Sequence, residues 1–492
     1  MKKIQLISAL VLVVMALCSC TNTDYQKVIP ANATVVVKAD MKSISEKADF
    51  KDSKYKQMLD ESLSAVVKGK DMDAVKAYID DPMKMGIDLS MPLYFFMAGE
   101  ETVGLTMKVG NEDDVKDFLQ LLNKQGMASK PQEKDGQMCG TLLDDIYYSY
   151  DKNTFLMLAS LKGSGTSATS RMARELMTLK EDDSFISTDA FDRMNDEEQD
   201  VVCYTNLNVL PKNMLDGWKV LLPENISAND IDFISSLDFE DGAASLKLRV
   251  CGKTDEAKKV IEEEGKNFGN IKGKFLERTS DDMLLWLGVN MKGEWLMKQL
   301  KKSRNVKELL FMMERVVDIE QMINAVDGDV AVEYPMEGLG SHGKPDYRMY
   351  AEVKNTDFLA DVKDWMATSK EYGMTYREVG NNKYVAEMDG ETFTWGVEDN
   401  VLYSSKGQVA APAKGSNPLE AYKKDIQNSR FFMFVNLEKL PLEQMGRSGD
   451  MPIRDALSSL KAIVLKSADV DELTLTVALK DKNENFLKQL LK

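Results

Sequence analysis

Residues 201–211 read VVCYTNLNVLP, and residues 431–441 read FFMFVNLEKLP. Both segments begin with an apolar run typical of a β-strand and end with Asn-Leu-x-x-Leu-Pro, at an offset of 230 residues. A shared ending after a shared strand pattern indicates an internal repeat. If the match between residues 201–211 and 431–441 extends along the rest of the chain, the fold is predicted to contain the same unit twice.

The same correspondence continues along most of the chain. VVVKADMKS (35–43) matches LWLGVNMKG (285–293) at an offset of 250. MKVGNEDDVKDFLQLLNKQGM (107–127) matches AEVKNTDFLADVKDWMATSKEYGM (351–374), where Val115–Phe118 falls on Val362–Trp365 and Gly126–Met127 on Gly373–Met374, both at 247. Near the end, SLKLRVCGKTDEAKKVI (245–261) matches TLTVALKDKNENFLKQL (474–490) at 229. Because the order is kept and the offset only falls, we predict two tandem copies, over residues 28–270 and 271–492.

Each copy is predicted to contain an amphipathic helix followed by a β-meander. In copy two, Thr356 can cap the start of the helix and Gly373 can close it. KYVAEMDGETFTWGVEDNVLYSS (383–405) holds three short β runs separated by turn residues, and CGTLLDDIYYSYDKNTFLMLAS (139–160) is its counterpart. Apolar residues at helical spacing predict one buried stripe in each helix: Val115, Phe118, Leu119 and Leu122, and Phe358, Leu359, Val362, Trp365 and Met366.

Each copy is predicted to end in an alternating strand and a short helix. Leu246, Leu248 and Val250 alternate in copy one, which predicts one dry sheet face. In copy two, the final helix is predicted to turn Phe486, Leu487, Leu490 and Leu491 inward. Hairpin strands with interposed helices indicate an α+β protein of two tandem, internally duplicated units, each a mostly antiparallel sheet backed by helices.

The first residues resemble a bacterial lipoprotein signal. Two lysines precede an apolar run that ends ALCSC (16–20). This resemblance implies that residues 1–19 are a signal peptide and that Cys20 is lipidated, with residues 20–27 as a short tether. Thr21 favours the outer membrane, and the single acid in TNTDYQK (21–27) favours its periplasmic face, with the cell surface as the alternative.

The lipoprotein signal, the duplicated layout and a first strand within IPANATVVVKADMKSI (29–44) resemble a family of uncharacterised Bacteroidota lipoproteins, classed as a domain of unknown function. The resemblance covers nearly the whole mature chain. It implies no activity and carries over no functional residues.

Composition excludes some classes of function. The chain has a net charge of −17, which repels nucleic acid and anionic lipid. Beyond the signal and Cys20, the cysteines are Cys139, Cys203 and Cys251; their wide spacing predicts no disulfide framework, and whether any two pair stays open. The 31 methionines favour core filler over an adaptable apolar binding surface.

No segment predicts a catalytic, cofactor or metal site. His342 is the one histidine, and with no paired cysteines a zinc site is not expected. LKGSGTSATSRMARELM (161–177) has the glycines of a phosphate loop but lacks its Gly-Lys-Ser/Thr, so we interpret it as a connector into a helix. Acids at 144–145, Asp151 and 398–399 fall at predicted turns, where acids are common for backbone reasons.

Three functions stay open at this point. We favour a non-catalytic envelope lipoprotein, anchored in the membrane by lipid on Cys20, that binds an envelope protein or component. The alternative is a carrier of an apolar ligand in a cleft between the two copies; Trp286, Trp295, Trp365 and Trp395 all fall in copy two, with core packing as their default role. A carboxylate-dependent glycan hydrolase, which needs two acids about 5–9.5 Å apart, is less favoured. No cofactor and no nucleic-acid partner are expected.

Overall fold

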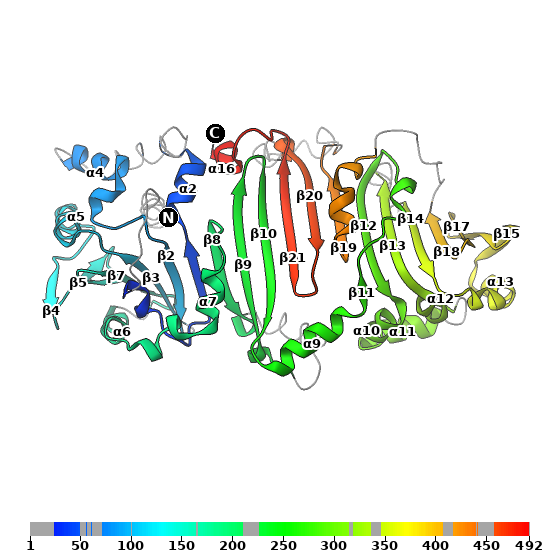
Figure 1. Ribbon diagram of the computed structural model, residues 1–492, viewed down its shortest axis with the longest axis horizontal. Helices are drawn as coiled ribbons and strands as arrows, with labels where there is room; N and C mark the ends of the chain where they lie inside the picture. Colours follow the sequence, from blue (N-terminus) through cyan, green and yellow to red (C-terminus); the bar gives the residue numbers. More distant parts are fainter. Residues whose placement is uncertain are drawn as a thin grey trace. The chain divides into compact units, whose positions relative to one another are not determined.

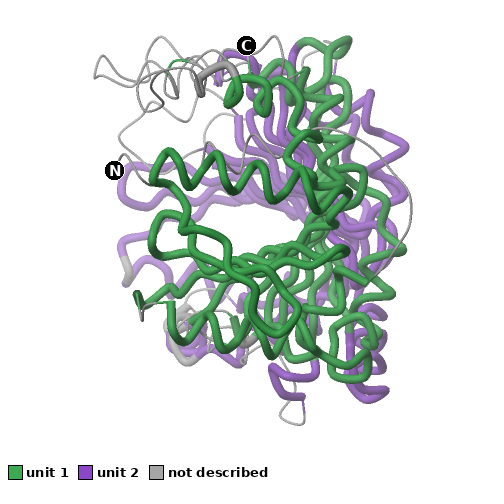
Figure 2. The backbone as a smooth tube through the Cα atoms, turned by 90° about the vertical axis from the view of Figure 1, so that its left-hand side faces the viewer, with its two compact units in different colours: residues 1–211, 231–251, 481–492 green, residues 212–230, 252–480 purple. Residues whose placement is uncertain are grey.

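A computed structural model describes residues 24–49, 56, 61, 71–99, 101–163, 166–209, 226–313, 318–335, 346–406, 417–438, 440 and 457–491. The chain divides into two compact units (Figure 2). Unit 1 comprises residues 1–211, 231–251 and 481–492, and unit 2 comprises residues 212–230 and 252–480. Each unit is built around one antiparallel sheet and is described by itself below.

The sheet of unit 1 has the strand order β10-β9-β8-β1-β2-β3-β7-β6-β5-β4 (Figure 1). Five of the nine neighbouring pairs are hairpins, whereas longer segments of chain separate the strands of β1–β2, β1–β8, β3–β7 and β8–β9. The strands are β1 (Val35–Ala39), β2 (Leu93–Ala98), β3 (Thr102–Lys108), β4 (Gln132–Lys134), β5 (Gln137–Leu142), β6 (Ile146–Tyr150), β7 (Thr154–Ser160), β8 (Val201–Asn206), β9 (Ile231–Glu240) and β10 (Ala243–Gly252).

Helices cover the two faces of this sheet unequally. A core cluster under η1, α6, η5 and α7 lines one face, and a second cluster under α5 lines part of the other face. The α5 helix begins where Asn111 accepts hydrogen bonds from the backbone N–H groups of Asp113 and Asp114. The helices are η1 (Asp24–Val28), α2 (Met41–Ala48), α4 (Asp71–Asp80), η3 (Pro82–Met85), α5 (Glu112–Lys124), α6 (Thr166–Met177), η4 (Glu181–Asp183), η5 (Phe185–Ser187), α7 (Asp189–Asn195), η6 (Leu207–Val209) and α16 (Phe486–Leu491).

The sheet of unit 2 has the strand order β21-β20-β19-β12-β13-β14-β18-β17-β16-β15, and β11 pairs with the end of β12. Its core brings Trp286 and Phe432 together with residues of several strands. The strands are β11 (Phe268–Gly269), β12 (Met283–Lys292), β13 (Val326–Pro335), β14 (Tyr347–Val353), β15 (Thr375–Gly380), β16 (Lys383–Met388), β17 (Glu391–Glu398), β18 (Val401–Lys406), β19 (Phe431–Asn436), β20 (Leu460–Ser467) and β21 (Glu472–Leu479).

The helices of unit 2 are mostly short. They are η7 (Ala228–Asp230), α9 (Asp255–Gly265), η8 (Leu276–Arg278), α10 (Gly293–Leu300), α11 (Arg304–Met313), α12 (Ile319–Ala325), η10 (Asp357–Asp361), α13 (Val362–Thr368), η11 (Ser369–Tyr372), η12 (Glu420–Tyr422) and α14 (Lys423–Gln427). The second core cluster of this unit packs Phe358, Val362 and Trp365 against the meander strands.

The predicted α+β class is confirmed, and so is the meander. Strands β16, β17 and β18 occupy the three predicted β runs. The turns between them place Asp389–Gly390 and Asp399–Asn400 at positive φ, which these residue types adopt at low cost. Phe358, Val362 and Trp365 are buried, as their helical spacing predicts.

Several local expectations were wrong. The helix of copy two is broken into η10, α13 and η11; Thr356 makes no side-chain cap, although Gly373 closes the segment at φ 75°. Leu490 is 60% exposed and Leu246 is 39% exposed, so neither side chain is buried. The residues 24–27 assigned to the tether form η1, whose Tyr25 is fully buried.

Candidate functional site

An apolar groove lies on one face of the unit 1 sheet, with a volume of about 290 Å³. Five strands contribute to it: β1, β2, β3, β6 and β7. The described residues that line the groove are all apolar: Val35, Val37, Phe95, Phe96, Met97, Val103, Gly104, Leu105, Ile146, Met157, Leu158 and Ala159. We call this site the unit 1 groove.

Strand register explains why these side chains gather. Residues directly opposite one another on paired antiparallel strands point to the same face. One row across the sheet contains Val103, Ala159 and Ile146. A second row contains Val37, Phe95, Leu105 and Met157. Most of these side chains are only half-buried, whereas residues of the opposite face such as Val36 are fully buried.

Gly104 lies between Val103 and Leu105 in the groove lining, and its missing side chain makes room for Phe96. A Cβ atom at this position would lie 2.2 Å from Cζ of Phe96, so only glycine lets the Phe96 ring lie across β3. Phe96 is 2% exposed and belongs to the core cluster of the opposite face. The groove is therefore built on a closely packed strand pair.

At the α5 end, the groove face merges into a core that holds stacked aromatic rings. The ring centroids of Tyr148 and Tyr150 lie 6.4 Å apart, and both rings stack on Phe155. Burial raises the pKa of both phenols, that of Tyr150 to about 12, with Glu112 and Asp113 adding to the shift at Tyr150. Because both pKa values are raised, the phenols stay neutral, and within the described part of the chain neither hydroxyl has a hydrogen-bond partner.

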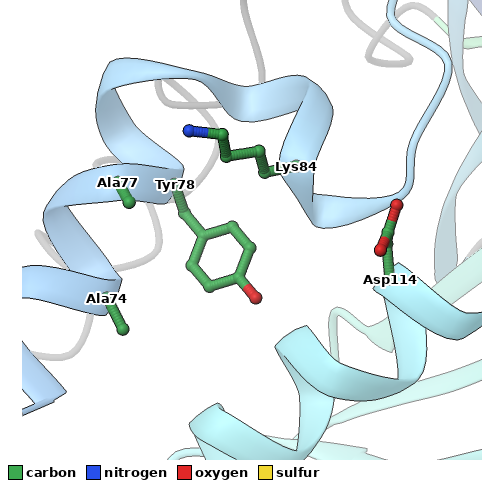
Figure 3. Close-up of a pocket in the computed structure, with 5 residues that line it drawn as sticks. All are labelled: Ala74, Ala77, Tyr78, Lys84 and Asp114. Carbon is green, nitrogen blue, oxygen red and sulfur yellow. The ribbon is translucent and has the colours of Figure 1, made fainter.

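A second hollow of about 270 Å³ lies between α4, η3 and α5. Figure 3 shows the Tyr78 side chain pointing from α4 into the space beside α5, while Lys84 extends from η3 back towards α4. The Tyr78 ring meets Phe118 edge-on at 5.0 Å, and burial, followed by Asp117 and Asp114, raises its pKa. Lys84 pairs with Asp81 at 3.7 Å, and with Asp114 it gives this hollow a polar part to its lining.

Buried acids in unit 1 are held by basic and polar groups. Asp200, 2% exposed, accepts hydrogen bonds from Lys47 Nζ at 2.8 Å and from the backbone N–H of Phe239 at 2.8 Å. Burial lowers the pKa of Lys47, but hydrogen bonds to Asp200 and Asp238 outweigh burial and raise it. Glu197 pairs with Lys247 and Arg249, each at 3.0 Å. These contacts join α2, β9 and β10 and give the acids a structural role.

Buried acids in unit 2 are held in the same way. Asp329 is 1% exposed and accepts hydrogen bonds from three successive backbone N–H groups, of Lys272, Gly273 and Lys274. Glu333 pairs with Arg348 Nη1 at 2.8 Å and accepts a hydrogen bond from the Ser280 hydroxyl. Burial raises the pKa of Glu333, while Ser280 and Arg348 oppose that rise.

Neither hollow supports hydrolysis by paired acids. Among the described lining residues, the unit 1 groove has no carboxylate and the hollow beside α5 has only that of Asp114. Within the ranges given above, no three of His, Cys, Asp and Glu gather as metal ligands would. His342 and Cys20 lie outside the described residues.

The other residues considered from sequence have ordinary places. Gly163 lies in the left-handed region of φ, three residues before α6 begins at Thr166. Trp286, Trp365 and Trp395 are buried core residues, as their default role predicts. Cys139, Cys203 and Cys251 are free thiols, and burial raises the pKa of Cys203 and Cys251.

Sequence reasoning missed the unit 1 groove. Its lining residues have the same alternating pattern as core residues, and the sequence gives no sign of which face a helix will cover. The one usable signal is FFMAGEETVGL (95–105), a hairpin whose apolar residues fall on both faces of the sheet.

Comparison with known proteins assigns the chain to a family. The chain belongs to the family described as Domain of unknown function (DUF4836), which matches residues 25–487. The predicted membership of an uncharacterised domain family is thereby confirmed. No curated protein matches the chain.

Solved structures similar to this chain include crystal forms IV and III of TP0453. Form IV has a TM-score of 0.27 at 10% identity and covers 46% of this chain and 79% of its own. Form III has a TM-score of 0.26 at 10% identity and covers 51% of this chain and 90% of its own. Likeness at this level carries no argument about fold or function. Within the described residues, no helix has the length and apolarity needed to cross a bilayer.

Proposed function

We propose that this protein is a non-catalytic, lipid-anchored envelope protein that binds an alkyl chain in the unit 1 groove. The observation that carries the proposal is the wholly apolar lining of that groove. An apolar cavity of about 150 Å³ takes up benzene, so about 290 Å³ suits a larger hydrocarbon. The described lining has no charged or polar side chain, which favours an uncharged hydrocarbon segment over a peptide or a sugar.

The anchor would hold the groove near its source of ligand. Tyr25 is fully buried, and its hydroxyl donates to the carbonyl of Pro92 at 2.8 Å. Five residues of extended chain from Cys20 reach about 18 Å. A lipid on Cys20 would therefore keep unit 1 close to the bilayer, on the periplasmic face of the outer membrane as we propose.

We further infer that the body arose by internal duplication. The strand orders of the two units correspond one to one, from β10 with β21 to β4 with β15. The registers support the inference: Val37 pairs with Cys203, and Leu287 pairs with Met433. These pairs differ by 250 and 230 residues, the same offsets that align the two copies in sequence. An experimental structure with different registers in the two units would contradict it.

Ligand binding can be tested with a fluorescent fatty acid, 11-(dansylamino)undecanoic acid, and the purified full chain. Ala159→Trp would fill the groove between Val103 and Ile146 and should abolish the fluorescence increase. Ala77→Trp would fill the hollow beside α5 and is the matched control, which should bind as the wild type does. Equal binding by all three proteins would refute the groove as the site.

The anchor needs a separate test, because the groove does not depend on it. Cys20→Ala should abolish acylation and move the protein from the detergent phase to the aqueous phase in Triton X-114 partitioning. Cys18→Ala is the matched control and should keep the lipid, since that residue lies inside the predicted signal peptide. An intact mass without acyl groups in the Cys18→Ala protein would overturn the assignment of Cys20.

A further inference from the structure

Two short helices are exchanged between the compact units. The α9 helix follows strand β10 of unit 1 along the chain, yet its residues belong to unit 2. The α16 helix follows strand β21 of unit 2, yet its residues belong to unit 1 (Figure 2). Each unit is therefore completed by the helix that follows the last strand of the other.

Specific contacts dock α9 in unit 2. Trp295 Nε1 on α10 donates to Glu264 at 2.5 Å, and Arg430 donates to the carbonyl of Gly265 at 3.2 Å. A Cβ atom at Gly265 would lie 2.8 Å from Val470 on the β20–β21 turn, so the helix end lies directly against that turn.

Corresponding contacts dock α16 in unit 1. The Phe486 ring stacks on Phe239 at 6.3 Å, and Asn485 Nδ2 donates to the carbonyl of Phe239 at 2.8 Å. Lys488 Nζ pairs with Asp49, the residue that ends α2, at 2.9 Å. We call the surface formed by Phe239, the β9–β10 turn and the end of α2 the α16 dock.

The attachment of α16 is marginal. None of its side chains is buried, and Leu490 at its end is 60% exposed. Residues 481–483, which connect it to β21, are exposed. Opening this attachment needs only a few half-buried contacts to break.

We propose that the α16 dock also accepts α16 from a second copy of this chain, giving a helix-swapped dimer. Exchange of an identical element between protomers is a low-cost route to a dimer, because every contact in the closed monomer is re-formed in the dimer. The partner is a second copy because the dock fits the Asn485, Phe486 and Lys488 pattern that α16 itself carries. Within one chain the same kind of exchange is already present, because α9 follows unit 1 but docks in unit 2, and α16 follows unit 2 but docks in unit 1.

Charge reversal of the Lys488–Asp49 pair tests the proposal on the full chain in detergent. Asp49→Lys alone and Lys488→Asp alone each place like charges across the dock, in the monomer and in their own homodimers. Mixed together, the two variants can form a heterodimer in which both ion pairs are attractive. An exposed ion pair contributes up to about 1 kcal/mol, so the heterodimer should exceed either homodimer by roughly fivefold or more.

Native mass spectrometry of the mixture, with one variant labelled with nitrogen-15, measures the three dimers separately. The double variant Asp49→Lys/Lys488→Asp is the control: it has the same backbone strain at residue 49, which adopts a φ of 48°, yet its pair is restored within one chain. It should dimerise no more than the wild type. The proposal would be overturned if the mixture contained only monomers, or if the two homodimers and the heterodimer were present in statistical proportion. Dimers that persist after deletion of residues 481–492 would also overturn it.

Discussion

Replacement of Arg348 by Met gives the sharpest test of the energetics of unit 2. Arg348 is 8% exposed and its partner Glu333 is 3% exposed, so the substitution leaves a buried carboxylate without its cation. Removal of one partner from a buried ion pair costs about 3–5 kcal/mol. We expect a loss of that size in the free energy of unfolding at pH 8.

The loss should depend on pH, with a definite sign. Burial already raises the pKa of Glu333, and Arg348 is one of the groups that oppose this rise. Without Arg348, the folded-state pKa rises further above the unfolded value of about 4.3. The folded variant then binds more protons than the unfolded chain, so its stability is greatest below that value and falls as the pH rises, by up to about 1.4 kcal/mol per pH unit.

Urea unfolding at pH 5 and pH 8, followed by tryptophan fluorescence, measures the effect. Trp286 lies directly across from Glu333 on the neighbouring strand and is 3% exposed, so its emission reports on this part of the core. The difference between wild type and Arg348→Met should be smaller at pH 5. Glu333→Gln combined with Arg348→Met removes the charge and should recover much of the stability, with no pH dependence. An equal loss at both pH values would refute the reasoning.

Three further predictions concern unit 1. Gly104→Ala should cost about 1–3 kcal/mol, measured by urea unfolding, because the new Cβ would clash with the Phe96 ring; Gly380→Ala, whose Cβ would meet its nearest neighbour at 3.9 Å, should be nearly neutral. Deletion of residues 481–492 should destabilise unit 1 by roughly 2–4 kcal/mol, from three half-buried apolar side chains of α16. It should speed the reaction of the unit 1 thiols with Ellman's reagent and leave the unfolding transition seen by tryptophan fluorescence, which reports unit 2, in place. In a series of n-alcohols, affinity for the groove should rise about fourfold per CH2, or about 0.8 kcal/mol, until the groove is filled; a flat series would contradict hydrocarbon binding.

Local chemistry made part of the fold predictable. The turns at Asp389–Gly390 and Asp399–Asn400 have residues that tolerate positive φ, and the flanking β runs leave few other arrangements. The helix over residues 112–124 was predictable for a similar reason, since Asn111 caps its start and its stripe of apolar residues recurs at helical spacing.

The site depends on non-local choices that no local pattern records. Val35 and Val37 alternate with Val36 as in any half-buried strand, and only the folded unit shows that helices cover the Val36 side. Glu333 and Arg348 are fifteen residues apart and become partners because β13 pairs with β14. The exchange of α9 and α16 was equally out of reach, because each helix follows its strand in the ordinary order.

The register of unit 2 explains why the groove we describe lies in unit 1. At the position where Ala159 lies opposite Val103 and Ile146, unit 2 has Lys406, opposite Tyr347 and Phe393. Lys406 is 9% exposed, and its Nζ pairs with Glu391 at 2.8 Å, so a buried charge and an ion pair occupy the site of the hydrocarbon lining. A charge at this position disfavours an alkyl chain, because the ligand would have to cover an ion pair that water now reaches at its rim. The proposed function requires an apolar lining, and at this position the face of unit 1 is apolar whereas the corresponding face of unit 2 carries an ion pair.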